Sequence, residues 1–210
     1  MINSVIFDMD GVLIDAKDWH YEALNRALLL FGYQINRYDH LTTFDGLPTR
    51  RKLQILSKER HLPEKLHEFI NEMKQRYTME IVNAKCKPRF NHQYALSKLK
   101  SEGYRIAVAS NSVRSSIDVM MKRAELDQYL EFTISNEDVI SAKPDPEMYN
   151  LAIKRLGVSA TDCLIVEDNE NGIRAARAAG AHVLEVTSVD DVTWTNLSRK
   201  ISSCNSSSAP

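Results

Sequence analysis

The sequence predicts an α/β protein in which a doubly wound parallel sheet is interrupted by an all-helical insertion. Three observations indicate this fold class. Short apolar runs recur without polar alternation, as expected of strands that are buried on both faces. Helical patterns that end near glycines lie between these runs. The stretch 15–85, which follows the first run, breaks this alternation and contains helical patterns alone.

The strands of the sheet should be short and rich in valine, isoleucine or leucine. They are predicted at 4–7, 105–109, 163–166 and 181–186. The helices that accompany the later strands are predicted at 94–102, 115–124, 146–156 and 172–179. Strands that alternate with helices form parallel sheets through right-handed crossovers, so helices should cover both faces of this sheet.

The insertion is expected to form a separate helical cap. Its helical patterns fall at 19–30, 37–42, 49–58 and 66–81. The predicted division is therefore an α/β catalytic core, 1–14 and 86–210, and an α-helical cap, 15–85, that determines substrate specificity. The serine-rich tail 202–210 is predicted to fray at the terminus.

Composition limits the class of protein. A chain of 210 residues suits one domain with a modest insertion, since domains average about 150 residues. Hydrophobic residues at 43% and charged residues at 26% exclude collagen, coiled coil and wholesale disorder. The formal net charge of -1 shows no basic excess for nucleic acid or an acidic membrane surface.

The cysteines and the apolar runs point to a cytoplasmic protein. Cys86, Cys163 and Cys204 lie far apart and show no metal-ligand spacing, which favours reduced structural thiols. No apolar run reaches the ~18 residues of a membrane span. The first residues lack the charged and apolar regions of a signal peptide. We therefore expect no membrane partner and no nucleic-acid partner.

The first apolar run ends in Asp8, Asp10 and Gly11. Ligands of open parallel sheets gather at the carboxyl ends of strands, and alternating side chains can place both carboxylates on one side. Two such carboxylates repel each other unless a cation neutralises them or one keeps a proton. Gly11 permits a sharp turn or a close approach to a ligand. A polar turn that merely ends the strand is the alternative.

Polar residues also follow the later strands. Ser110 and Asn111 precede a helix start, where they either bind an anion with the helix N–H groups or serve as a cap. Lys143 precedes a helix that begins with proline, where a solvated surface charge is the alternative. Glu167 and Asp168 follow the third predicted strand, where acids also offset a helix dipole.

Together these side chains suit one kind of chemistry. The carboxylates at two strand ends can hold a divalent cation that prefers oxygen, and Mg²⁺ fits best because it pairs with substrate phosphate. The anion-binding part of the site would consist of the Ser110 hydroxyl, the Asn111 amide, the Lys143 ammonium and the N–H groups at the helix start. Phosphoryl transfer needs both the cation site and the anion-binding part, because the protein mainly positions the reacting groups and stabilises the charge on the phosphoryl oxygens.

These residues resemble the motifs of the haloacid dehalogenase-like superfamily. The motifs stand in the family's order, as Asp8-Met9-Asp10-Gly11-Val12, Ser110-Asn111, Lys143-Pro144 and Glu167-Asp168. The resemblance covers the whole core and implies a Rossmann-like fold, and the insertion looks like the family's small helical cap. Within the family, the chain looks most like the branch of β-phosphoglucomutases and of small sugar-phosphate or polyol-phosphate phosphatases.

The resemblance implies a mechanism. Asp8 would be the nucleophile that forms an aspartyl-phosphate, and Asp10 would be the general acid and base. Mg²⁺ would sit on the Asp8 carboxylate, the Asp10 backbone carbonyl and Asp168, with Glu167 in the same shell or supporting it. The transferring oxygens would be held by Ser110, Asn111 and Lys143.

Substrate residues of the cap follow from the same resemblance. His20 stands where the mutase-like branch carries a histidine, and an ordinary surface or core histidine is the alternative. The loop that contains Asp45, Gly46 and Arg50 resembles the branch's specificity loop, although the mutases carry a lysine in place of Asp45. Arg89 follows a hinge where relatives usually have Pro-Gly, and it faces either the active-site mouth or solvent.

Asp45 favours a phosphatase over a mutase, because a mutase must grip the second phosphate of a bisphosphate with positive charge. The leading hypothesis is a Mg²⁺-dependent phosphatase acting on a small soluble sugar, polyol or amino-alcohol phosphate. A phosphosugar mutase is the first alternative. A non-catalytic phosphometabolite-binding protein is the second, and the intact Asp8 and Asp10 argue against it. The sequence leaves the oligomeric state open, with a monomer favoured.

Overall fold

The computed structural model describes residues 1–207. In this part of the chain a parallel five-stranded sheet has the strand order β3-β2-β1-β4-β5. The strands are β1 (Ser4–Phe7), β2 (Arg105–Ala109), β3 (Phe132–Ile134), β4 (Cys163–Glu167) and β5 (His182–Glu185). The predicted α/β class with a doubly wound parallel sheet is confirmed.

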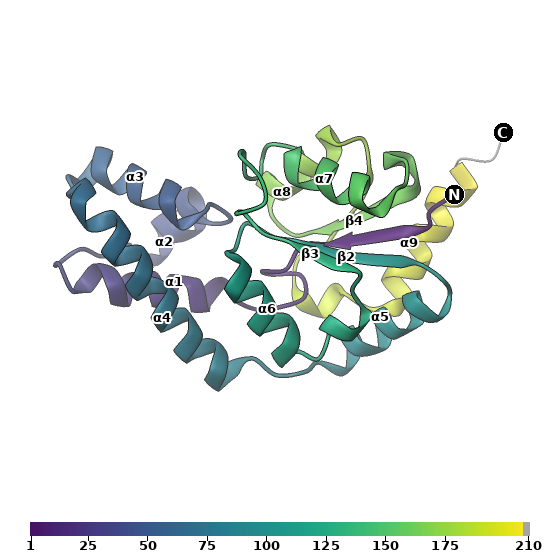
Figure 1. Ribbon diagram of the computed structural model, residues 1–210, viewed down its shortest axis with the longest axis horizontal. Coiled ribbons are helices and arrows are strands. Elements are labelled where there is room, and N and C mark those ends of the chain that lie inside the picture. Colours follow the sequence, from purple (N-terminus) through teal and green to yellow (C-terminus); the bar gives the residue numbers. More distant parts are fainter. Residues whose placement is uncertain (208–210) are drawn as a thin grey trace. The chain divides into compact units, whose positions relative to one another are not determined.

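Helices cover both faces of the sheet (Figure 1). α7 (Glu147–Leu156) and α8 (Glu170–Ala178) lie on one face. α5 (Phe90–Ser101), α6 (Arg114–Arg123) and α9 (Trp194–Ser207) lie on the other. Short 3₁₀ turns occur at Asp127–Tyr129, Ala160–Asp162 and Val189–Asp191.

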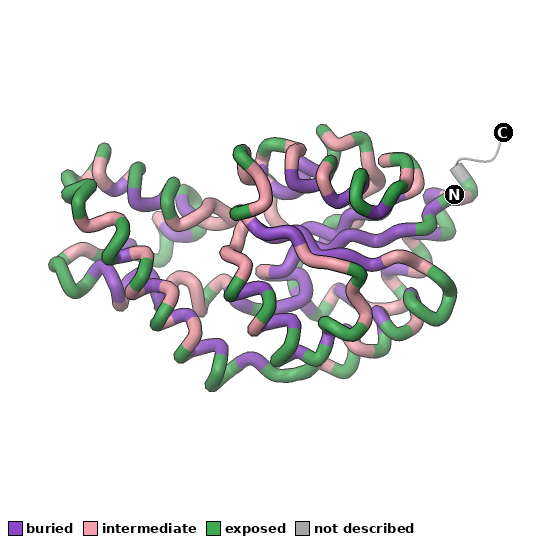
Figure 2. Tube along the Cα trace, in the orientation of Figure 1, coloured by how far each residue is buried: buried purple, intermediate pink, exposed green. Residues whose placement is uncertain are grey.

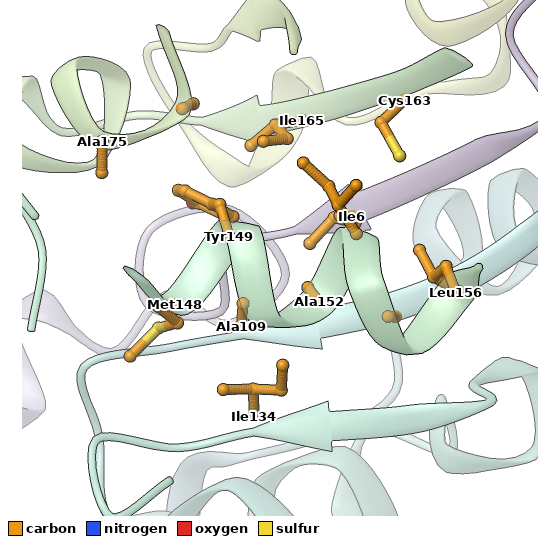
Figure 3. Packing of buried hydrophobic residues seen from close by; sticks show 13 residues of the cluster. Ile6, Ala109, Ile134, Met148, Tyr149, Ala152, Leu156, Cys163, Ile165 and Ala175 are labelled. Atoms are coloured by element: carbon orange, nitrogen blue, oxygen red, sulfur yellow. The ribbon is translucent and has the colours of Figure 1, made fainter. Parts of the chain in front are cut away.

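The strands are buried along almost their whole length in the centre of the sheet (Figure 2). Ile6 and Ile165 pack with residues of α7 and α8 in one apolar cluster, in which Tyr149 and Ala152 face the strand layer (Figure 3). Phe7 is equally buried and belongs to the opposite face, because successive side chains of a strand alternate. A sheet buried on both faces explains the strands' lack of polar alternation.

Two parts of the core differ from the prediction. β3 was not expected, because it has only three residues and two of them are half-buried. The tail was expected to fray from residue 202, but α9 continues to Ser207. Ile201 and Cys204 are buried on this helix, and Asn205 Oδ1 accepts from the Ile2 backbone N–H at 2.7 Å. Residues 208–210 of the predicted frayed tail lie outside the described residues.

The chain divides into two compact units, of which the second is Ala16–Cys86. This unit contains α1 (Lys17–Leu29), α2 (Arg37–Asp39), α3 (Thr49–Arg60) and α4 (His67–Lys85). A π-helical turn, His40–Phe44, continues from α2, and a 3₁₀ turn, Glu64–Leu66, precedes α4. The unit has its own core, which includes Leu24, Leu28, Phe44, Leu53 and Ile70.

None of the helices in residues 1–207 combines the length and the apolar character that a bilayer crossing requires.

Candidate active site

The polar residues that follow β1, β2 and β4 lie at the same edge of the sheet. Asp8 continues the β1 ladder, since its backbone N–H donates to Val166 O at 3.0 Å. Ser110 continues β2 in the same way and donates to Ile134 O at 3.0 Å. Glu167 is the last residue of β4. Because all these strands are parallel, their carboxyl ends bring the motifs together at the expected position for a ligand site.

Lys143 joins two of the carboxylates. Its Nζ donates to Asp8 Oδ1 at 2.6 Å, to Glu167 Oε1 at 2.7 Å and to the Ala109 carbonyl oxygen at 2.8 Å. These contacts use all three N–H groups of the ammonium. The residue is only 4% exposed, so the alternative of a solvated surface lysine is wrong. A cation this deeply buried requires such partners, because an unpaired buried charge is strongly unfavourable.

The charges in this cluster perturb each other strongly. Burial raises the pKa of Asp8 well above its usual value; Lys143 opposes the rise, and the neighbouring carboxylates add to it. Burial alone would lower the pKa of Lys143, but Asp8 and Glu167 outweigh it and the pKa is raised. The lysine therefore stays cationic beside these carboxyl groups.

The acidic groups have the chemistry of a divalent cation site. Asp8, Glu167 and Asp168 each offer a carboxylate oxygen, and these oxygens lie within 4.8 Å of one another. Hard oxygen donors of this kind are what Mg²⁺ and Ca²⁺ prefer. A cation between them would relieve the repulsion between these carboxylates, which adds to the rise that burial causes in the pKa of Asp8. The residues present therefore fit the metal that the sequence predicts.

Both oxygens of Glu167 accept hydrogen bonds within the protein. Oε1 accepts from Lys143 and from the Tyr149 hydroxyl at 2.5 Å. Oε2 accepts from the backbone N–H groups of Asp168 at 3.1 Å and of Asn169 at 3.3 Å. The side chain is thus held from two directions. Tyr149 was not among the predicted site residues, because a tyrosine on an apolar helix face ordinarily indicates packing.

Asp10 is oriented by the loop that follows β2. The Ser112 hydroxyl donates to Asp10 Oδ2 at 2.7 Å, and the Ser112 backbone N–H donates to Ser110 Oγ at 3.1 Å. Gly11 turns the chain with a φ of 93°, and its N–H donates to Ile14 O at 2.7 Å. Ser112 is not among the predicted site residues. Its place in the Ser110-Asn111-Ser112 run was the available signal.

Asn111 supports the loop that carries Lys143. Its Oδ1 accepts from the Lys143 backbone N–H at 3.1 Å, and its Nδ2 donates to the Lys143 carbonyl oxygen at 3.4 Å. The Asn111 carbonyl in turn accepts from Asn136 Nδ2 at 2.9 Å. The amide predicted to hold phosphate thus fixes the backbone of the lysine.

The predicted substrate residues of the second unit have partners within that unit. Asp45 lies 3.6 Å from Lys17 Nζ in an ion pair. His20 Nδ1 lies 3.2 Å from Lys74 Nζ, and Lys74 is only 7% exposed. Gly46 has a φ of 70°, which is a left-handed conformation that favours glycine.

Two further predicted substrate residues are arginines. Arg50, in α3, is exposed. Arg89 belongs to the first unit, where its guanidinium pairs with the exposed carboxylate of Asp190.

Comparisons with known proteins identify the family of this chain. A family profile described as haloacid dehalogenase-like hydrolase matches residues 5–186. The protein named Phosphorylated carbohydrates phosphatase from Thermotoga maritima is 30% identical over 182 residues, covering 85% of this chain and 82% of the relative. Pyrophosphatase PpaX from Anoxybacillus flavithermus is 27% identical over 196 residues, covering 92% and 85%.

A solved structure shares the fold. The crystal structure of β-phosphoglucomutase from Clostridium difficile matches with a TM-score of 0.83 at 21% identity, covering 97% of this chain and 98% of the other. The family profile spans most of the chain and includes each motif that lies at the carboxyl edge of the sheet. The chain therefore belongs to the haloacid dehalogenase-like hydrolases, and it is an enzyme.

Proposed function

We propose that the protein is a Mg²⁺-dependent phosphatase that hydrolyses a small soluble phosphomonoester through an aspartyl-phosphate on Asp8. The observation that carries the proposal is the Asp8 carboxylate at the end of β1. It accepts from Lys143 at 2.6 Å, and oxygens of Glu167 and Asp168 lie within 4.8 Å of its own. The relative named Phosphorylated carbohydrates phosphatase supports a sugar or polyol phosphate as substrate.

The proposed reaction has two displacements at phosphorus. An Asp8 oxygen attacks the phosphorus, the bond to the leaving oxygen breaks, and Asp10 protonates that oxygen. Asp10 then takes a proton from water, whose oxygen attacks the same phosphorus. The bond between the Asp8 oxygen and phosphorus breaks in this step, which releases inorganic phosphate, frees the Asp8 carboxylate and leaves Asp10 protonated again. The Ser112 hydroxyl, at 2.7 Å, would keep Asp10 in one orientation through both steps.

Lys143 would have two parts in this scheme. Its ammonium keeps the Asp8 oxygen in place and offsets the charge of the phosphoryl oxygens. All of its N–H groups have protein acceptors. An incoming phosphoryl oxygen must therefore replace one of them, and Asp8 is the partner that the reaction itself draws away. Ser110 would complete the phosphate-binding half, with Asn111 fixing the lysine loop.

Mg²⁺ would be held by the Asp8 carboxylate, the Asp10 backbone carbonyl and Asp168. Glu167 would support this site rather than ligate, because both of its oxygens already accept hydrogen bonds. When bound, the cation would neutralise the negative charge that Asp8 and the phosphate share. Asp8 would then be ionised despite the burial that raises its pKa.

Substrate choice would belong to the helical unit, through His20, Asp45, Gly46 and Arg50. Lys17 forms an ion pair with Asp45 in this unit. Lys17 offsets the charge of Asp45, so Asp45 repels a second phosphate less than its isolated charge would. A phosphosugar mutase is therefore kept as the second candidate, and the named phosphatase relatives favour hydrolysis.

The test is phosphate release from a panel of sugar, polyol and amino-alcohol phosphates. The wild-type protein is compared with Asp8→Asn, with a matched control, Asp127→Asn, and with a sample treated with chelator. We expect release that requires both Asp8 and Mg²⁺, and that the control leaves unchanged. Release that survives Asp8→Asn overturns the mechanism. Isomerised product that appears only with added bisphosphate establishes the mutase instead.

A further inference from the structure

Tyr149 is a fully buried tyrosine whose hydroxyl reaches the carboxylate cluster. It lies in the first turn of α7 and packs among the apolar residues between α7 and the strands (Figure 3). Its hydroxyl donates to Glu167 Oε1 at 2.5 Å. A phenylalanine would fill nearly the same space without a polar group to satisfy, so packing alone does not explain the hydroxyl.

We propose that Tyr149 and Gly172 are positioning residues that fix the Glu167 carboxylate and, through it, Lys143. The proposal rests on the function proposed above, since Lys143 is assigned there to the reacting phosphate. It adds two residues to which the motifs assign no role.

Tyr149 contacts both members of the ion pair. The hydroxyl shares Glu167 Oε1 with Lys143 Nζ, which lies 2.7 Å from that oxygen. The same Nζ lies 4.6 Å from the centroid of the tyrosine ring, within the range of a cation–π contact. One rigid side chain therefore holds the acid by its hydroxyl and faces the cation with its ring.

The backbone of Gly172 lies close against the same carboxylate. It lies in α8, and a Cβ added there would lie 1.8 Å from Glu167 Oε1, 2.0 Å from Cδ and 2.4 Å from Oε2. No real side chain tolerates such distances, so any larger residue must displace the carboxylate. Glycine weakens a helix relative to alanine, so the helix gives no reason for it at this position. The space is occupied by Glu167.

Displacing Glu167 would disturb two parts of the site at once. Oε1 holds the lysine that contacts Asp8, and Oε2 holds the backbone N–H of Asp168. The side chain is 1% exposed, so no water shell can replace these partners at little cost. Groups that orient the residues of a metal site typically contribute about 10- to 100-fold to activity or metal affinity.

The experiment compares Tyr149→Phe and Gly172→Ala in the full-length protein. Tyr33→Phe is the matched control, because it also removes a hydroxyl that donates to a protein oxygen, His61 O at 3.1 Å, but in the helical unit. Melting temperature, kcat, KM and the Mg²⁺ concentration for half-maximal activity are measured for each. We expect kcat/KM to fall about 10- to 100-fold in both test variants. The control should stay within about twofold of wild type.

Melting temperatures distinguish a positioning role of Tyr149 and Gly172 from a role in packing alone. Gly172→Ala should lower the melting temperature, because displacing the carboxylate disrupts buried partners and the gain in helix propensity offsets only part of that cost. The positioning role predicts that kcat/KM also falls well below this temperature, where the variant is fully folded. A loss of activity that only follows a loss of stability overturns the proposal. In a Glu167→Ala background the alanine at 172 has room, so Gly172→Ala should cause no further loss. Losses that multiply in the double variant also overturn it.

Crystal structures of the variants provide a readout that needs no activity. The Glu167 carboxylate should move away from Lys143 in Gly172→Ala and lose its fixed orientation in Tyr149→Phe. If it stays in place in both, the proposal fails even where the wild type releases phosphate. If the wild type hydrolyses nothing, the proposed function fails, and the carboxylate positions still decide whether Tyr149 and Gly172 fix Glu167.

Discussion

Lys143 and Asp8 lie 135 residues apart in the chain, yet Lys143 Nζ donates to Asp8 Oδ1 at 2.6 Å in the buried edge of the sheet. The contact exists because β1 lies at the centre of the sheet and β2 and β4 flank it. The loop after β3 can therefore bring its lysine between the ends of β1 and β4. The same cation also pairs with Glu167 at 2.7 Å, so one ammonium holds two acids from different strands.

Removing this cation should destabilise the protein as well as inactivate it. Lys143→Met keeps much of the side-chain volume but leaves Asp8 and Glu167 buried without their shared partner. Breaking a buried ion pair on one side typically costs about 3–5 kcal/mol. We expect the free energy of unfolding in urea at neutral pH to fall by about that amount. Adding Glu167→Gln should restore part of it, and a Lys143→Met variant as stable as wild type would contradict the paired arrangement.

Ser112→Ala should lower kcat more than it changes KM. The hydroxyl donates to Asp10 Oδ2 at 2.7 Å and orients the proposed acid and base without being assigned to substrate. A hydrogen bond to a charged group contributes about 1.5–3 kcal/mol, which corresponds to roughly a tenfold or larger fall in kcat. Steady-state kinetics check this. Ser115→Ala, at an exposed position of α6, is the control and should be neutral.

The site motifs could be predicted because each follows a short apolar run directly. Asp8, Ser110 and Glu167 each lie at the end of a strand. The apolar run that predicts the strand therefore also locates the residue. Tyr149 could not be predicted in the same way. It is separated from Glu167 by 18 residues, and only the packing of α7 on the sheet brings its hydroxyl to the carboxylate.

The helical unit shows the same limit. Lys74 has the spacing of a surface position on α4, but its ammonium contacts His20, 54 residues earlier in the chain. The sequence shows the charge of Asp45, but only the fold places Lys17 beside it, where Lys17 offsets that charge. Local patterns predict which face of a helix is apolar. They do not predict which charged side chains meet across helices.

Acidification should destabilise the protein through His40. This residue is almost fully buried and its ring packs against Tyr21 at 4.8 Å between centroids. Burial, helped by nearby Lys52, lowers the pKa of His40 from 6.5 to about 4. Below pH 6.5 the unfolded chain therefore binds a proton that the folded chain does not. Stability should fall as the pH falls through this window, by up to about 3 kcal/mol near pH 4.

Urea unfolding at several pH values measures this effect. His40→Phe keeps an aromatic ring against Tyr21 and removes the titrating group, so the slope of stability against pH between 6.5 and 4 should become shallower. His92 has a pKa lowered mainly by burial, and it should supply part of the slope that persists. An unchanged slope in His40→Phe would show that His40 is not held neutral in the folded state.

Asp45→Asn should shift substrate preference if the helical unit selects the substrate. The substitution removes a negative charge and releases Lys17 from the ion pair that spans 3.6 Å. The loop then carries one negative charge less and Lys17 is no longer neutralised. Substrates with a second anionic group should therefore gain in kcat/KM relative to sugar or polyol phosphates that have no charge besides the reacting phosphate. A change of one charge near the surface corresponds to about 1.5-fold to fivefold in this ratio. Glu59→Gln, on an exposed position of α3, removes the same charge elsewhere and should leave the ratio unchanged. A ratio that moves equally in both variants would assign the effect to net charge and not to the loop.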